Sequence, residues 1–146
     1  MRCKDRYVAW ANDKGVSVYD LDAMGHIGFV KRNTLMHPTV HQYSVVWMLH
    51  DPSEQFLHHR LIIGFGRSVD VLIVKERHQY MKHNPTPIVT RFLQRIATIN
   101  LESYVCSIAP MWKSKNHIFI LCYNDDNEEW KNVTAPRPEL SIMDIM

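Results

Sequence analysis

Residues 7–21 read YVAWANDKGVSVYDL, and this stretch decides the fold. A β-prone run, Tyr7–Ala11, is followed by the polar turn Asn12–Gly15 and then by an alternating run, Val16–Leu21. Asn and Gly accept the positive φ angles that tight turns require. The stretch therefore predicts a β-hairpin.

Alternation in the second run predicts which side chains share a face. Val16, Val18 and Asp20 are expected on one face of the strand, and the two residues between them on the other. Met24 and Gly25 then mark a further turn, and residues 26–30 can form a third strand. The unit is expected to be a small antiparallel meander.

The order of strand, turn and strand returns twice along the chain. The second copy comprises Leu61–Gly66 and Val69–Val74, and the third begins at Ile118–Tyr123 and ends in a weaker strand at Leu140–Ile145. Insertions at His50–His59 and His78–Pro87 would account for the spacing between copies, which exceeds that of common blades. Further strands are expected between the copies at Tyr43–Leu49, Ile88–Ile99 and Tyr104–Ala109.

Residues 88–100 have two interpretations. Ile88, Phe92, Arg95, Ile96 and Ile99 fall at helical spacing, so a short helix is possible there. The prolines just before the segment suit either a helix start or a loop that leads to an outer strand. Because its neighbours are strands and the repeat needs one there, we favour a strand.

Repeated antiparallel units of this kind predict an all-β fold, a partial WD40-like β-propeller of roughly two to three blades. The approximate blades are 1–42, 43–99 and 100–146, and the first is expected to contain only the later strands of a blade. Because a closed propeller needs roughly four to eight blades, this chain is not expected to close a ring alone.

Composition places the chain among packed globular proteins. Hydrophobic residues make up 46% and charged residues 22%, and the net charge is +2. The basic residues are scattered among acidic ones, so we expect no nucleic-acid partner. Three cysteines without a CxxC pair, no signal peptide and no apolar run long enough to span a bilayer favour a cytoplasmic protein.

The residues that suggest catalysis or metal binding have simpler explanations. His37 and His41 are four apart, but they lack a third ligand at useful spacing, so surface histidines are the better interpretation. Gly64–Ser68 lacks the ending of a phosphate-binding loop and fits a hairpin turn. Cys106 and Cys122 lie in apolar segments and are expected to be buried. We therefore predict no catalytic, cofactor-binding or metal-binding residues.

Two charged segments and the tryptophans bear on partners. The acidic stretch Asn124–Glu129 lacks the central glycine of a calcium loop and is expected to be solvated. A basic cluster is either a solvated face or a contact for an acidic partner or an anionic membrane. It comprises Lys75, Arg77, His78, Lys82 and His83. Tryptophans are expected mostly in the core or at blade interfaces, namely Trp10, Trp47, Trp112 and Trp130.

The same motifs resemble a known family. Tyr7–Asp20 resembles the IAWAN-x-x-GVK-aromatic-D segment of the vacuolar protein sorting-associated protein forty-one family, and Leu61–Val69 followed by Val74–Arg77 is similar to its LIIGWGTSVKV…VKER segment. Phe65 stands where that family usually has Trp. Shorter likenesses to its GLAP and RPRL stretches follow in the same order, at Ile108–Pro110 and Arg137–Leu140.

The resemblance implies a non-catalytic scaffold, a fragment of a subunit of the HOPS tethering complex, which acts in vesicle transport to the vacuole or lysosome. It implies partners among the other HOPS subunits, a late-endosomal Rab GTPase and an adaptor complex, with peripheral attachment to late-endosomal and vacuolar membranes through them. Recognition is expected on loops, which carry binding more often than strands do. The candidate protein-binding residues are Asp13, Lys14, Arg67, Asp125 and Asp126.

Two alternatives stay open at this point. One is a histidine-dependent metal-binding β protein, which chelators would unfold. The other is a truncated propeller remnant without a specific partner, which would expose apolar surface.

Overall fold

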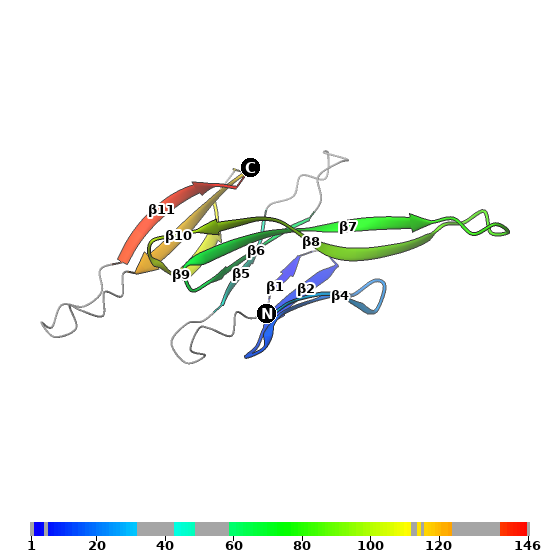
Figure 1. Ribbon diagram of the computed structural model, residues 1–146, viewed down its shortest axis with the longest axis horizontal. Coiled ribbons are helices and arrows are strands. Elements are labelled where there is room, and N and C mark those ends of the chain that lie inside the picture. The colour runs from blue at the N-terminus through cyan, green and yellow to red at the C-terminus, as the bar shows by residue number, and fades with distance from the viewer. Residues whose placement is uncertain are drawn as a thin grey trace, which may run out of the picture.

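The computed structural model describes residues 2–4, 6–31, 43–48, 59–111, 114, 116–123 and 138–145. Within these ranges every helix or strand is a β-strand, and the strands form three antiparallel sheets (Figure 1). The predicted all-β class is confirmed. No helix in the described part of the chain is long and apolar enough to cross a membrane.

The first sheet has four strands in the order β1-β2-β3-β4. They are β1 (Arg2–Lys4), β2 (Tyr7–Ala11), β3 (Gly15–Asp20) and β4 (Gly25–Lys31). The predicted hairpin is β2–β3, with Tyr7 opposite Asp20. The expectation that this sheet lacks its early strands was wrong, because β1 pairs with β2. The sequence of β1 has no apolar alternation to reveal it; backbone pairing alone defines it.

The second sheet also has four strands, in the order β5-β6-β7-β8. They are β5 (Ser44–Trp47), β6 (Arg60–Phe65), β7 (Ser68–Gln79) and β8 (Ile88–Asn100). Residues 88–100 are thus a strand, as favoured above, and not a helix. The insertion expected from His78 was placed too early, because His78 and Gln79 still belong to β7 and pair with β8.

The third sheet has three strands in the order β11-β10-β9. They are β9 (Tyr104–Pro110), β10 (His117–Tyr123) and β11 (Pro138–Asp144). In β10 buried and half-buried side chains alternate, so Ile118, Ile120 and Cys122 face the second sheet.

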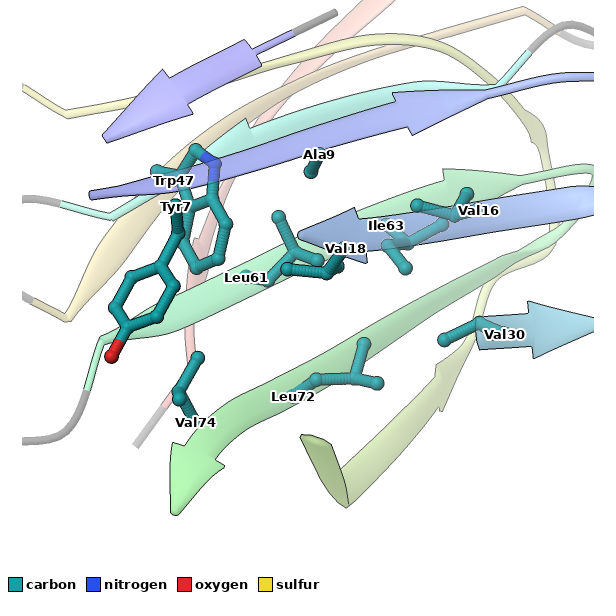
Figure 2. Close-up of a cluster of buried hydrophobic side chains, with 10 residues drawn as sticks. All are labelled: Tyr7, Ala9, Val16, Val18, Val30, Trp47, Leu61, Ile63, Leu72 and Val74. Atoms are coloured by element: carbon teal, nitrogen blue, oxygen red, sulfur yellow. The ribbon is translucent and has the colours of Figure 1, made fainter. Parts of the chain in front are cut away.

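The second sheet lies between the other two and buries both of its faces. One face packs on the first sheet in the cluster drawn in Figure 2, which comprises Tyr7, Ala9, Val16, Val18, Val30, Trp47, Leu61, Ile63, Leu72 and Val74. The other face packs on the third sheet through Ile62, Val69 and Val71, against residues that include Val105, Ile108 and Ile118. Burial on both faces explains why β6 and the first half of β7 are nearly continuous apolar runs.

Corresponding strands of neighbouring sheets lie side by side. Strand β5 contacts β1 and β2 on one side and β9 on the other, and β4 contacts β8. Gly28 of β4 allows this last approach, because a Cβ atom there would lie 2.6 Å from Cδ1 of Leu93. The hairpin β7–β8 continues past this contact and projects from the body of the molecule (Figure 1).

The first two sheets carry the same irregularity at the same place. The register of β3 against β4 shifts between Val18 and Tyr19, and that of β7 against β8 shifts between Val71 and Leu72. Both shifts follow the fourth residue of the strand. Each leaves one extra residue on the outer strand, Ile27 or Ile96, which is the arrangement of a β-bulge.

Candidate functional site

A buried carboxylate joins the first two sheets. Asp20, at the end of β3, is fully buried and accepts two hydrogen bonds of 2.8 Å from the guanidinium of Arg6. The backbone N–H groups of Asp22 and Ala23 donate to the same carboxylate at 3.0 and 3.3 Å. Asp20 therefore has the partners that a buried charge requires.

These contacts keep Asp20 ionised. Burial acts to raise the pKa of its carboxyl, but the hydrogen bonds from Arg6 and from the two backbone N–H groups outweigh burial and lower the pKa below its usual value. Arg91 of β8 extends the network, with Nη1 at 3.7 Å from Asp20 Oδ2 and Nη2 at 2.9 Å from Glu76 Oε1. A carboxylate fixed in this way serves to hold sheets together, and it is unsuited to proton transfer at neutral pH.

The β2–β3 turn carries two of the predicted binding residues. Oδ1 of Asn12 accepts hydrogen bonds from the backbone N–H groups of Lys14 and Gly15, at 2.8 and 3.1 Å. Asn12 N–H in turn donates to the carbonyl of Gly15. The turn is thus fixed by Asn12, while the side chains of Asp13 and Lys14 are exposed to solvent.

The β6–β7 turn carries a third predicted binding residue, Arg67. Gly66 has a φ of 60°, in the left-handed region that favours glycine, and Arg67 beside it is exposed. The Arg67 guanidinium lies 4.5 Å from the ring centroid of Tyr104 in β9. Backbone N–H groups of Leu101 and Val105 donate to the carbonyls of Arg67 and Gly66. Arg67 is therefore anchored against the third sheet.

A pocket of about 490 Å³ lies at the end of the molecule where these two turns are found. It is lined from all three sheets, by Ala9, Trp10, Ala11, Tyr43, Ser44, Val45, Cys106 and Ser107. The Ser44 hydroxyl accepts a hydrogen bond of 2.9 Å from the Ile108 N–H, which gives it a structural role. Histidine and carboxylate side chains are absent from the lining residues that the structure describes.

Cys106 and Cys122 were both expected to be buried, and this holds for one of the two. Cys122 is 6% exposed and lies in the core between the second and third sheets. Cys106 is exposed, and the prediction for it was wrong. Ser107 and Val105 oppose consecutive residues of β10, so Cys106 is the extra residue of a bulge and is turned out of the alternation.

Thiol labelling is expected to distinguish the two cysteines. In a Cys3→Ser background, iodoacetamide should modify Cys106 in the folded protein and reach Cys122 only after denaturation, since alkylation needs access to the sulfur. Mass spectrometry of the peptides gives the two rates. Equal rates in the folded state would contradict the bulge geometry.

The remaining predicted residues are distributed as follows. Trp47 is buried as expected, and Trp10 lines the pocket. His59 packs edge-on against the Tyr7 ring at 5.0 Å. Outside the described residues lie Asp125, Asp126, the segment Asn124–Glu129, Trp112, Trp130, His37, His41 and His58. Among the residues that the structure does describe, no group of three or more His, Cys, Asp or Glu is placed to hold a metal ion.

Sequence reasoning missed two features of this surface. The ion pair of Asp20 was not predicted, although Arg6 directly precedes the residue that pairs with Asp20 in the hairpin. That adjacency is the signal that could have revealed it. The exposed apolar tip of the β7–β8 hairpin, with Tyr80 and Met81, was also missed. In the sequence this tip follows a polar stretch, which looks like part of an ordinary loop.

Comparison with known proteins agrees with this geometry. The family model Beta-prop_Vps41, described as "Vps42 beta-propeller", matches residues 1–146. The chain belongs to the Vps41 β-propeller family. Its three unclosed antiparallel sheets are therefore part of a β-propeller, as the resemblance implied.

The curated relatives that match this chain are vacuolar protein sorting-associated protein 41 homologs. The chain is 27% identical over 146 residues to the vacuolar protein sorting-associated protein 41 homolog of Homo sapiens, covering 98% of this chain and 15% of the relative. The homologs of Danio rerio and Solanum lycopersicum are 27% and 28% identical, covering 96% and 93% of this chain and 15% of each relative. No solved structure matches. The chain thus spans about 15% of the length of these relatives.

Proposed function

We propose that this propeller segment is a non-catalytic scaffold in a HOPS-type tethering subunit that acts in vesicle transport to the vacuole or lysosome. The observation that carries the proposal is the match of the Vps41 β-propeller family over the whole chain. The proposed partners are other HOPS subunits, a late-endosomal Rab GTPase and an adaptor complex. The proposed location is cytoplasmic, at the surface of late endosomes and vacuoles.

The arrangement of the sheets supports a propeller whose blades are 1–42, 43–99 and 100–146. The first, second and third sheets fall within these three ranges in order, except that the last residue of β8, Asn100, lies one position past the second range. On the outer face of the third sheet, Ile142 lies beside Phe119 and Leu140 beside Leu121, and both β11 side chains are more than half exposed. We propose that another blade covers this apolar face in the longer proteins of the family.

The proposed protein-binding surface is the end of the molecule that carries the β2–β3 and β6–β7 turns. Asp13 and Lys14 present charges there on a turn whose backbone is already fixed by Asn12. Arg67 presents its guanidinium edge from above Tyr104. A turn whose backbone is already fixed loses little backbone conformational entropy on binding, which favours recognition. Asp125 and Asp126 stay predictions for the same surface.

Charge reversal at these turns tests the proposal. In the protein that contains this segment, Lys14→Glu combined with Arg67→Glu is expected to reduce co-purification of HOPS subunits roughly tenfold or more, since unfavourable charge across an interface costs several kcal/mol. Quantitative mass spectrometry of the affinity-purified complex measures the loss.

The matched control is Gln94→Glu, which adds negative charge at an exposed position in the middle of β8, away from both turns. It should leave recovery unchanged. If the parent protein recovers no HOPS subunit, the tethering role is wrong. If it recovers them equally well with both variants, the role stands but the binding surface lies elsewhere.

A further inference from the structure

The hairpin of β7 and β8 extends well past the first sheet (Figure 1). Pairing between the strands is unbroken from Glu76 and Arg91 to Gln79 and Ile88. The turn beyond them is ordered by two hydrogen bonds, from Asn84 N–H to the Met81 carbonyl and from Thr86 N–H to Asn84 Oδ1. We call residues 77–90 the distal arm. It is a structured ribbon with a defined tip.

Apolar side chains are exposed along the distal arm. Tyr80 is 78% exposed and Met81 is 60% exposed at the tip, and Ile88 and Val89 follow on the returning strand at 48% and 40%. Large apolar side chains gathered in this way at a protruding end have no packing role in the described structure. They mark a surface that is covered by something else.

The charge of the distal arm has one sign. Arg77 and Lys82 lie within it, His78 and His83 accompany them, and the sequence from 77 to 90 contains no Asp or Glu. The acidic groups that balance basic residues elsewhere stop at Glu76, whose carboxylate lies 2.9 Å from Arg91 and 3.4 Å from His78 of the arm. A basic and apolar tip is complementary to an anionic surface with an apolar interior.

We propose that the distal arm inserts its tip into the interface of an anionic lipid bilayer. A tyrosine and a methionine at a convex tip suit the headgroup boundary, where an aromatic ring can be half buried while its hydroxyl stays hydrated. Basic side chains next to the tip then lie at the anionic surface. The absence of Asp and Glu from residues 77–90, together with the exposed apolar side chains, favours an anionic bilayer over a protein as the occupant. This contact is direct and does not depend on the partners proposed above.

Vesicle flotation tests the inference. The chain is mixed with vesicles of phosphatidylcholine alone or of phosphatidylcholine with phosphatidylserine, and the bound fraction is measured at low and high salt. Wild-type protein is expected to float with the anionic vesicles and to be released by salt. The double variant Tyr80→Ser/Met81→Ser should bind roughly tenfold less tightly or worse, because it removes the inserted apolar groups. Lys82→Glu should weaken binding by about fivefold or more, since each basic group near the surface contributes about fivefold.

Met24→Ser is the matched control, because Met24 is a methionine that is 74% exposed and lies on the β3–β4 turn, outside the arm. It should bind as the wild type does, and circular dichroism should show unchanged β-structure for every variant. The proposal is overturned if wild-type protein does not float, if it floats equally with neutral vesicles, or if Met24→Ser loses as much binding as the tip variant. Loss of HOPS-subunit binding by tip variants, with no vesicle binding by the wild type, would instead make the arm a protein-binding surface.

Discussion

Replacement of Asp20 by alanine is expected to lower the free energy of unfolding by about 3 kcal/mol. The carboxylate is fully buried and accepts hydrogen bonds from Arg6 and from two backbone N–H groups. Without it, these donors lose their partner, and the two cations Arg6 and Arg91 face each other without the charge between them. We take the lower end of the range for broken buried pairs, because the Arg6 side chain is 26% exposed and water can reach it.

The matched control for this prediction is Asp22→Ala. Asp22 lies 3.4 Å from the same Arg6 Nε atom but is 66% exposed, so its loss should cost only about 0.5 kcal/mol. Urea denaturation followed by circular dichroism measures both values. If Asp20→Ala is no more destabilising than Asp22→Ala, the buried network does not hold the sheets together as we infer.

Acid should destabilise the protein partly through the same residue. The pKa of Asp20 is lowered in the folded state, so its contribution to stability is complete above the unfolded pKa of about 4 and is lost as the pH falls through the lower folded value. Asp20→Asn cannot titrate, so its stability should decline less between pH 5 and the acid limit. Chemical denaturation at a series of pH values tests this, and parallel curves for the two proteins would contradict it.

Gly64→Val is expected to cost about 2 to 3 kcal/mol through overpacking between the second and third sheets. A Cβ atom at Gly64 would lie 2.5 Å from Ile108 Cδ1 and 2.7 Å from Val105 Cγ1. The tip of Ile108 can move, but the β-branched Val105 cannot easily do so. The third sheet would have to shift away from β6, and its core contacts with Ile62 would loosen.

Gly25→Val is the matched glycine control, because the nearest atom to a Cβ there is the Ala23 carbonyl oxygen at 3.8 Å. Its effect should stay within about 0.5 kcal/mol of zero. Ile108→Ala should partly rescue Gly64→Val, so the two changes should couple in a double-mutant cycle. Additive costs measured by thermal or urea unfolding would show that these residues do not meet.

The hairpins could be predicted because turn chemistry and alternation agree within a few residues. Asn12 and Gly15, and later Gly66, require the chain to turn where it does. The strand at 88–100 was predictable only from its neighbours, since its apolar residues also fit a helix. Its pairing with β7 shows that the segment is a strand, and that pairing is a tertiary contact rather than a local property of the segment.

Other features could not be predicted, for physical reasons. Strand β1 has no apolar alternation in its sequence and the arm has no buried face, and backbone pairing leaves no mark in side-chain periodicity. Cys106 is exposed because a bulge shifts the alternation by one residue, and counting by twos along a strand does not detect such a shift. Of the candidate site, the sequence located the turns of Asp13, Lys14 and Arg67, but not the pocket beside them, which three separate sheets build.

The matching bulges of the first two sheets have a geometric consequence. A bulge bends its strand and adds right-handed twist locally. Because Ile27 and Ile96 are both inserted opposite the point that follows the fourth residue of the inner strand, β3 or β7, both outer strands receive the same additional bend. Each unit should then meet the next at the same angular step. The circumference of a ring built from such units depends on one inserted backbone residue per unit, and it would be largely insensitive to which apolar side chains fill the core.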